Sequence, residues 1–276
     1  MSNMLRNQNP FVITQTIMEH NLINKESKLG TKHNLRLTIK AQLLAFMFLS
    51  IFGVTELLYA KEKAVDTFSN TYQVKKIKLA TVETTNGAIS VTGYEGEEII
   101  IDAEFVVTGR KKKVCEELVK KMELKVHIDN NSFEIDTDFK SKMGYSSSVS
   151  IYLKIPHRLK AECESKNGGI FVENVTGGVE LETTNGGIKC ENVSGGVEVE
   201  TVNGGVSLKN IEGNTNASTV NGGLLAEFSK TTPDQVSLET VNGRVSVSFA
   251  NTPNGTVHAS TINGSLKISG KKVPKT

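Results

Sequence analysis

The sequence predicts an all-β protein, a parallel β-solenoid of the β-helix or β-roll type with coils of about 18 residues. Two observations predict this fold. Asn-Gly recurs at residues 167, 185, 203, 221, 242 and 263, and the intervals divide into nine-residue halves such as VELETTNGG (179–187) and IKCENVSGG (188–196). Such fixed-period similarity is typical of solenoids, in which stacked copies bury a core that no single copy could bury alone. One short flanking helix and an N-terminal signal-like or transmembrane-like helix complete the expected fold.

Each nine-residue half predicts one short strand followed by one corner. Positions 1 and 3 are apolar, positions 2 and 4 are mostly charged, and positions 8 and 9 are rich in glycine. This alternation is the pattern of a strand with one buried face, so each coil should add one strand to each of two facing parallel sheets. The expected inward residues are Ile170, Val172, Val179, Leu181, Ile188, Cys190, Val197, Val199, Val206 and Leu208. The residues at position 6 should tuck under the corners: Val175, Val193, Val202, Ile211, Val220, Val241 and Ile262.

The Asn-Gly pairs are interpreted as structural corners. Glycine permits the backbone angles that a sharp turn requires, and a side chain in its place would collide or strain. Asparagines stacked one coil apart can hydrogen-bond along the solenoid axis or adopt a left-handed corner conformation. The residues with this expected role are Asn86, Gly87, Asn167, Gly168, Asn185, Gly186, Asn203, Gly204, Asn221, Gly222, Asn242, Gly243, Asn263 and Gly264. The longer turns at residues 230–234 and 251–254 should protrude from one edge.

The chain upstream of the regular repeat is expected to be a β part with one inserted helix, residues 61–166, followed by the regular solenoid, 167–270, and a charged tail, 271–276. Asn86-Gly87 opens a unit that matches the later coils, and RKKKVCEELVKKM (110–122) carries an apolar stripe at helical spacing. That helix should cap or flank the solenoid, although a basic amphipathic helix can also contact acidic lipid. Strands are expected at 124–128, 132–137 and 149–155, and the lysines and proline of the tail discourage a further strand from adding to the edge.

Residues 1–60 read as a leader. The apolar run LLAFMFLSIFGV (43–54) follows Lys32, Arg36 and Lys40 and precedes Leu58-Tyr59-Ala60, which fits a signal-peptide cleavage site. The alternative is an uncleaved membrane anchor over residues 41–60, which reaches spanning length only by including Gln42 and Glu56. The protein is therefore expected to be exported, to the periplasm, the cell surface or the extracellular space, with membrane contact only through this segment.

Charge and cysteine content exclude several classes of function. Residues 1–60 hold six of the 32 Lys and Arg and three of the 30 Asp and Glu, so the remainder carries a net charge of −1 and gives no indication of nucleic-acid binding. The cysteines, Cys115, Cys163 and Cys190, are odd in number and lack CxxC spacing, which argues against a disulfide framework or a zinc site. Cys163 and Cys190 fall at inward repeat positions and are expected to be buried small hydrophobic residues.

The pattern predicts no catalytic residues, no cofactor and no dedicated metal site. Calcium-binding β-rolls place an aspartate in each turn, but no aspartate occurs between Asp138 and Asp234. A candidate acidic face remains on the outward positions of one sheet: Glu162, Glu164, Glu180, Glu182, Glu198, Glu200 and Glu239. The opposite sheet mixes both signs of charge. The acidic face is either a solvated surface that prevents sheet stacking or a surface that binds cations or a cationic partner.

A leader, a TTNGAISVTGYEGEEIIIDA unit, the strand pair SVSIYLKIPHRLKAECESKNGGI and the Asn-Gly-Gly coils occur here in one order. In this order the chain resembles the bacterial "putative adhesin" family of exported β-strand-repeat proteins, over residues 68–269. The resemblance implies a β-helix-like solenoid at the cell envelope and no catalytic residues. The leading hypothesis is a non-catalytic binding or scaffold module for a cell-surface polymer, glycan or protein. The alternatives are a β-helix carbohydrate-active enzyme and a membrane-tethered sensor of envelope stress.

Overall fold

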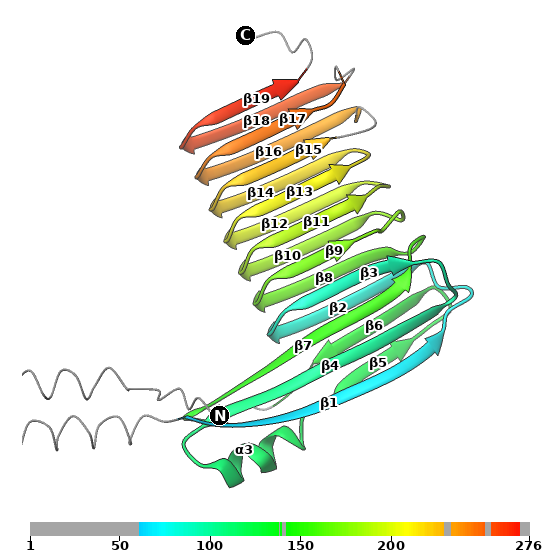
Figure 1. The fold of residues 1–276 in the computed structure, drawn as a ribbon, viewed down its shortest axis with the longest axis vertical. Coiled ribbons are helices and arrows are strands. Elements are labelled where there is room, and N and C mark those ends of the chain that lie inside the picture. Colours follow the sequence, from blue (N-terminus) through cyan, green and yellow to red (C-terminus); the bar gives the residue numbers. More distant parts are fainter. Residues whose placement is uncertain (1–60, 138, 140–141, 229–232, 252–254, 271–276) are drawn as a thin grey trace, which may run out of the picture. The chain divides into compact units, whose positions relative to one another are not determined.

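The computed structural model describes residues 61–137, 139, 142–228, 233–251 and 255–270, shown in colour in Figure 1. The expected leader or anchor, the charged tail and most of the two long turns lie outside these residues. Within them, no helix has the length and apolar character needed to cross a membrane.

Two facing sheets make up the described chain. In spatial order the ten-stranded sheet A consists of β1 (Glu62–Gln73), β4 (Glu98–Gly109), β7 (Tyr145–Pro156), β3 (Ile89–Tyr94), β9 (Ile170–Glu173), β11 (Ile188–Val193), β13 (Val206–Ile211), β15 (Leu224–Phe228), β17 (Val245–Phe249) and β19 (Leu266–Gly270). The nine-stranded sheet B consists of β18 (Thr256–Asn263), β16 (Gln235–Asn242), β14 (Thr215–Asn221), β12 (Val197–Asn203), β10 (Val179–Asn185), β8 (Lys160–Asn167), β2 (Leu79–Asn86), β6 (Ser132–Thr137) and β5 (Leu124–Ile128).

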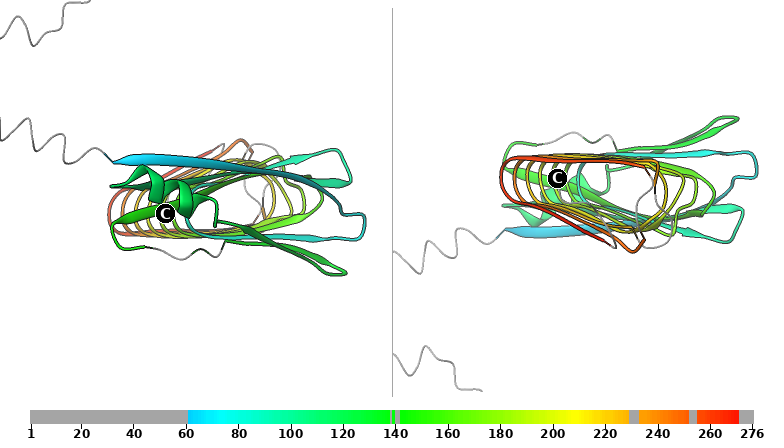
Figure 2. Two further views of the ribbon diagram at one scale, coloured as in Figure 1. Left: turned by 90° about the horizontal axis from the view of Figure 1, so that it is seen from below. Right: turned by 90° about the horizontal axis from the view of Figure 1, so that it is seen from above.

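The strands from β8 onward alternate between the two sheets, and each pairs in parallel with the strand one coil away (Figure 1). Pairing is in register with the sequence repeat, so that Asn167, Asn185 and Asn203 lie side by side. The predicted β-solenoid is therefore confirmed. All ten residues expected to point inward are buried, and they fill the space between the sheets that Figure 2 shows along the solenoid axis.

The two halves of most coils differ at position 5, which is threonine in β10, β12, β14 and β16 of sheet B and asparagine in the sheet A halves that begin with β9, β11 and β13; in β15 and β17 it is a buried phenylalanine. In sheet B the alternation continues, so Thr183 and Thr201 are buried, and each hydroxyl donates to a glycine carbonyl one coil earlier, at 3.0 Å. In sheet A, Asn174, Asn192 and Asn210 adopt a left-handed conformation with φ between 54° and 59°. Asparagine tolerates this conformation better than most residues do.

That left-handed residue corrects the expectation for position 6. A left-handed residue breaks the alternation, so position 6 turns inward in sheet A, where Val175, Val193 and Ile211 are buried. In sheet B the alternation is unbroken and position 6 points outward, which leaves Val202 and Val220 each 40% exposed. The prediction that all position-6 residues tuck under the corners was therefore wrong for sheet B, including Val241 and Ile262.

The Asn-Gly column forms a continuous ladder of side-chain amides, which we call the Asn ladder. Each Nδ2 from Asn167 onward donates to the Oδ1 of the asparagine one coil earlier, at 2.9–3.0 Å. The members are Asn86, Asn167, Asn185, Asn203, Asn221, Asn242 and Asn263. The axial hydrogen bonding expected of this column is present, whereas the left-handed conformation belongs to the asparagines at position 5.

Glycine is required at the Asn-Gly corners because the coils approach closely there. A Cβ on Gly186 would lie 2.1 Å from the carbonyl oxygen of Gly168, and one on Gly204 would lie 1.9 Å from that of Gly186. Neither glycine has a positive φ, so the expected collision is found but the special backbone angle is not. Among the described Asn-Gly glycines only Gly87, at the first described corner, has a positive φ (132°); the other glycines with positive φ lie at the opposite corners, for example Gly195 (86°) and Gly196 (107°), and in one turn, at Gly144 (82°).

The N-terminal part extends both sheets. β2 and β3 form a coil in register with β8 and β9, as the Asn86-Gly87 pair predicted. Beyond this coil β1, β4 and β7 pair antiparallel as long strands, and β1 was not anticipated from the sequence. Because residues 61–166 and 167–270 share both sheets, their separation into domains stays a prediction.

The helix α3 (Lys112–Val119) confirms the predicted flanking helix and packs against β1 and β4 at the N-terminal end of the solenoid (Figures 1 and 2). Within its apolar stripe, Cys115 is fully buried and Val119 is 4% exposed. The stripe therefore contributes to the core, which favours the flanking role over the alternative of lipid contact.

We expect Gly204→Ala to destabilise the protein by more than about 2 kcal/mol, because its Cβ would overlap the backbone of the preceding coil. The matched control is Gly205→Ala, whose Cβ would lie 3.4 Å from the Gly223 oxygen, an ordinary contact, and should cost less than about 1 kcal/mol. Urea unfolding of both variants measures the difference. Equal losses would show that close approach is not the reason for glycine here.

Candidate functional site

The outer face of sheet B carries two rows of carboxylates. The short row consists of Glu162, Glu180 and Glu198 on adjacent strands. The long row runs over five adjacent strands and consists of Asp136, Glu83, Glu164, Glu182 and Glu200. Six of the seven predicted acidic-face residues thus lie in the rows. The structure adds Glu83, which the prediction missed although it precedes Asn86 by three residues as Glu182 precedes Asn185, and Asp136, which the repeat pattern could not place.

Glu239 lies on the same face but apart from the rows. Its neighbours in register are Ser218 and Ser260, so no carboxylate adjoins it. His258 Nε2 lies 3.5 Å from Glu239 Oε1 and pairs with it when the imidazole is protonated. Glu239 therefore belongs to the acidic face without extending the long row.

Like charges within each row are one strand spacing apart. At about 4.8 Å, two carboxylates repel by roughly 0.9 kcal/mol in a water-like dielectric, before salt screening. Among the described residues, Glu164, Glu182 and Glu200 make no ion pair. These three glutamates thus form an exposed line of negative charge within the long row, whereas Asp136 at its other end lies in register with Lys125.

Lys160 compensates part of the short row. Its Nζ donates to Glu162 Oε1 at 2.6 Å and to Glu180 Oε2 at 2.8 Å. The hydrogen bond to Glu162 raises the pKa of the Lys160 ammonium group most, and the hydrogen bond to Glu180 raises it further. Glu198, one strand further along, has no such partner among the described residues, so the charge of the row increases away from Lys160.

An open groove of about 630 Å³ borders the short row, and we call it the corner groove. It crosses the starts of β8, β10, β12, β14 and β16, so its length follows the solenoid axis. Its wall and floor are formed by Lys160, Gly177, Gly178, Val179, Glu180, Gly195, Gly196, Val197, Glu198, Asn214, Thr215, Asn216, Gln235 and Ser237. The lining thus includes two glycine pairs, Gly177-Gly178 and Gly195-Gly196, together with Glu180 and Glu198.

The outer face of sheet A is balanced by comparison. Lys189 pairs with Glu191 at 3.1 Å and places its ammonium group 5.0 Å from the centre of the Phe171 ring. Lys209 lies in register between Glu191 and Glu227. Opposite charges alternate on this face, so the acidic character is confined to sheet B.

The described residues contain no group of three or more His, Cys, Asp or Glu side chains arranged to hold a metal ion. Cys163 and Cys190 are 3% and 0% exposed. Burial raises the pKa of both thiols, that of Cys190 to about 12, so neither is ionised at neutral pH. Both cysteines are buried small hydrophobic residues, as their repeat positions predicted.

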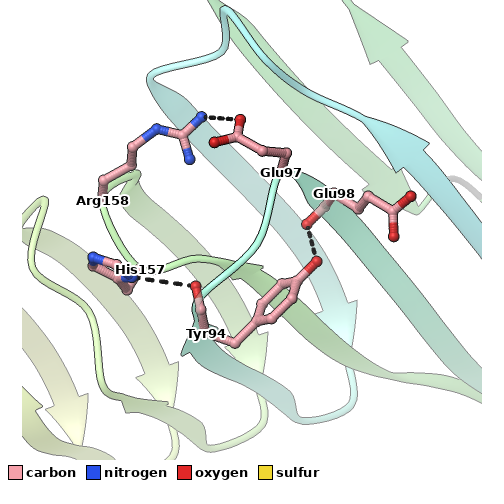
Figure 3. A network of polar contacts seen from close by, with 5 residues as sticks. All are labelled: Tyr94, Glu97, Glu98, His157 and Arg158. Carbon is pink, nitrogen blue, oxygen red and sulfur yellow. Dashed lines mark hydrogen bonds and ion pairs between the residues drawn. The ribbon is translucent and has the colours of Figure 1, made fainter.

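A polar cluster connects two turns of the N-terminal part (Figure 3). The backbone N–H of His157 donates to the carbonyl of Tyr94 at 3.0 Å, and its ring Nδ1 lies 3.3 Å from the same oxygen. Tyr94 donates its hydroxyl to the Glu98 carbonyl, and Arg158 pairs with Glu97, both at 2.9 Å. These contacts connect the turn after β3 to the turn after β7. We therefore interpret the cluster as structural and not as a binding site.

The sequence matches the Toastrack DUF4097 family over residues 59–275, which includes every strand described above. The chain belongs to the Toastrack family. This match confirms the resemblance to the "putative adhesin" family that the sequence suggested. No curated protein matches this Toastrack chain.

Several solved structures align with the Toastrack chain at low identity. A "putative adhesin" from Bacteroides fragilis is 13% identical over 75% of this chain and 97% of its own, with a TM-score of 0.40. A "putative cell adhesion protein" from Clostridium sporogenes is also 13% identical, over 75% and 100%, with a TM-score of 0.38. A "putative lipid binding protein" from Parabacteroides distasonis is 9% identical over 75% and 97%, with a TM-score of 0.30. At this similarity they carry no argument about function.

We expect Glu182→Gln to stabilise the Toastrack chain by up to about 1 kcal/mol at low ionic strength, because Glu182 lies between Glu164 and Glu200. The gain should vanish in about 1 M salt, where charges are screened within about 3 Å. Thermal unfolding at both salt concentrations measures it.

Glu227→Gln on sheet A is the control for this prediction. Glu227 lies in register with Lys209, so its neutralisation removes a favourable neighbour and should give no gain. A similar stabilisation of both variants would contradict an origin in the row.

Proposed function

We propose that this protein is a non-catalytic, exported binding module of the cell envelope, and that it holds an extended cationic partner along the corner groove and the acidic rows of sheet B. The partner is a cell-surface polymer or protein that carries repeated positive charges. Export itself rests on the leader expected within residues 1–60.

The observation that carries this proposal is that the groove and the rows run in the same direction. Glu180 and Glu198 line the corner groove, and Glu182 and Glu200 lie two residues further along the same strands. An extended chain in the groove would therefore meet the carboxylates of Glu180 and Glu198 on two adjacent coils, followed by Asn216 and Ser237 on the next two. Because stacked strands are about 4.8 Å apart, the two carboxylates lie one short strand spacing from each other.

The charge of the site supports a cationic partner over a neutral or anionic one. In the free protein, neighbouring carboxylates within each row repel one another. A bound cationic chain would reduce this repulsion and would also be attracted to the carboxylates. The same charge disfavours nucleic acid, whose phosphates would approach carboxylates. Contacts of this exposed kind give fast, salt-dependent association.

Binding of a fluorescent oligolysine to the full chain tests the proposal, with oligoglutamate as the control ligand. We expect Glu180→Gln/Glu198→Gln to raise the Kd for oligolysine about tenfold at low salt, since two ion pairs of about 0.5–1 kcal/mol each are lost. The affinity of the unmodified protein should fall steeply with salt.

The matched control is Glu191→Gln/Glu227→Gln, which removes the same charge from sheet A and should leave Kd within about twofold. If both double variants weaken binding equally, net charge and not the groove recognises the ligand. If oligolysine does not bind the unmodified protein at low salt, the proposed cationic partner is wrong.

A further inference from the structure

The Asn ladder consists of Asn-Gly pairs, and this dipeptide carries a known chemical liability. The backbone nitrogen of the glycine attacks Cγ of the asparagine side chain, a C–N bond forms, and ammonia leaves. Water then opens the cyclic imide to aspartate or to isoaspartate, in which the main chain runs through the side-chain carbon. The reaction needs a glycine nitrogen and an asparagine amide that are both free to move.

Six of the seven pairs in the ladder are restrained at both reacting groups. The N–H groups of Gly87, Gly168, Gly186, Gly204, Gly222 and Gly243 each donate to the asparagine carbonyl one coil further on, at 3.0–3.1 Å. The Oδ1 of each preceding asparagine accepts a hydrogen bond from the next Nδ2 in the ladder. Reaction at these pairs requires both bonds to break.

The last pair lacks both restraints, because β18 is the edge strand of sheet B in the described part of the chain. Asn263 Nδ2 donates to Asn242 Oδ1, but its own Oδ1 accepts no hydrogen bond from a described residue. The N–H of Gly264 likewise has no acceptor among the described residues. Gly264 is exposed, whereas the glycines of the other six pairs are only partly exposed.

We propose that Asn263 is a site of spontaneous deamidation. Its deamidation then makes Asn242, one coil earlier in the ladder, susceptible to the same reaction. An aspartate at 263 cannot donate a hydrogen bond to Asn242 Oδ1, and its negatively charged carboxylate oxygens would repel that oxygen. The Gly243 N–H donates to the backbone carbonyl of Asn263. Isoaspartate adds an atom to the main chain at residue 263 and so displaces this acceptor. Asn242-Gly243 then loses its side-chain restraint in either product and its backbone restraint in the isoaspartate product, and becomes the new end of the ladder.

One further Asn-Gly pair, Asn254-Gly255, lies outside the ladder and has to be separated from the effect. It shares a tryptic peptide with Asn263, because the nearest cleavage sites are Arg244 and Lys267. The experiment therefore uses full-length protein that carries Asn254→Gln, so that Asn263-Gly264 is the one Asn-Gly pair left in this peptide.

The protein is incubated at 37 °C and at neutral and mildly alkaline pH, and aspartate and isoaspartate are quantified at each ladder position by tandem mass spectrometry. We expect Asn263 to convert at least about tenfold faster than the six restrained asparagines, since two hydrogen bonds protect each of those. Isoaspartate should accumulate and the rate should rise with pH, as attack by a backbone nitrogen requires. In urea all seven positions should convert at similar rates.

The inward step is tested with Asn263→Asp in the same background. Conversion of Asn242 should become several-fold faster than in the parent, while conversion of Asn185, in the middle of the ladder, should not change. Uniform conversion of folded protein, or an Asn263 no faster than Asn185, would overturn the proposed site. An unchanged Asn242 in the Asn263→Asp variant would overturn the inward step.

Discussion

The close approach of successive coils at the Asn-Gly corners is the constraint on which the rest of the structure depends. Only glycine fits where a Cβ would lie about 2 Å from the backbone of the preceding coil, as at Gly186 and Gly204. That approach keeps each strand in register with the strand one repeat away. The register in turn brings the asparagine amides within hydrogen-bonding distance and lets the buried threonine hydroxyls reach a glycine carbonyl. One steric requirement therefore organises both the backbone and the side-chain ladders.

The same register has an electrostatic consequence on the outside of the solenoid. A repeat that places a valine beneath a valine in the core also places a glutamate beside a glutamate on the surface, and Glu182 and Glu200 are such a pair. On sheet A the repeat varies its charges, so Lys209 faces glutamates on both sides. Sheet B keeps its glutamates over several coils, and Lys160 compensates only the start of the short row. The concentration of uncompensated charge on one sheet, next to a groove along the axis, is the basis of the proposed binding function.

The two ends of a solenoid differ from its middle because neighbouring coils supply both burial and hydrogen bonds. At the N-terminal end, antiparallel strands and α3 cover the core, and Cys115 and Val119 are buried there. At the C-terminal end the last coil is more open, and Leu266 is 48% exposed where its counterpart Val245, one coil earlier, is fully buried. The same asymmetry leaves Asn263 as the last donor of the Asn ladder, with no described residue donating to its own Oδ1. End effects, rather than local sequence, therefore distinguish otherwise equivalent Asn-Gly pairs.

The sequence by itself determined the solenoid, the inward residues, the Asn-Gly corners, the flanking helix and the face on which Glu180 and Glu182 lie. It could do so because the alternation of apolar and polar residues reports which side of a strand is buried, and the repeat reports which strands stack. Tertiary structure alone decided that Asp136 joins the long row, that β1 pairs with β4, and that Val193 and Val202 point in opposite directions. The first two depend on pairing between strands far apart in the chain, which local periodicity does not encode. The third depends on a backbone conformation, the left-handed Asn192, which reverses the alternation on which the sequence-based prediction relied.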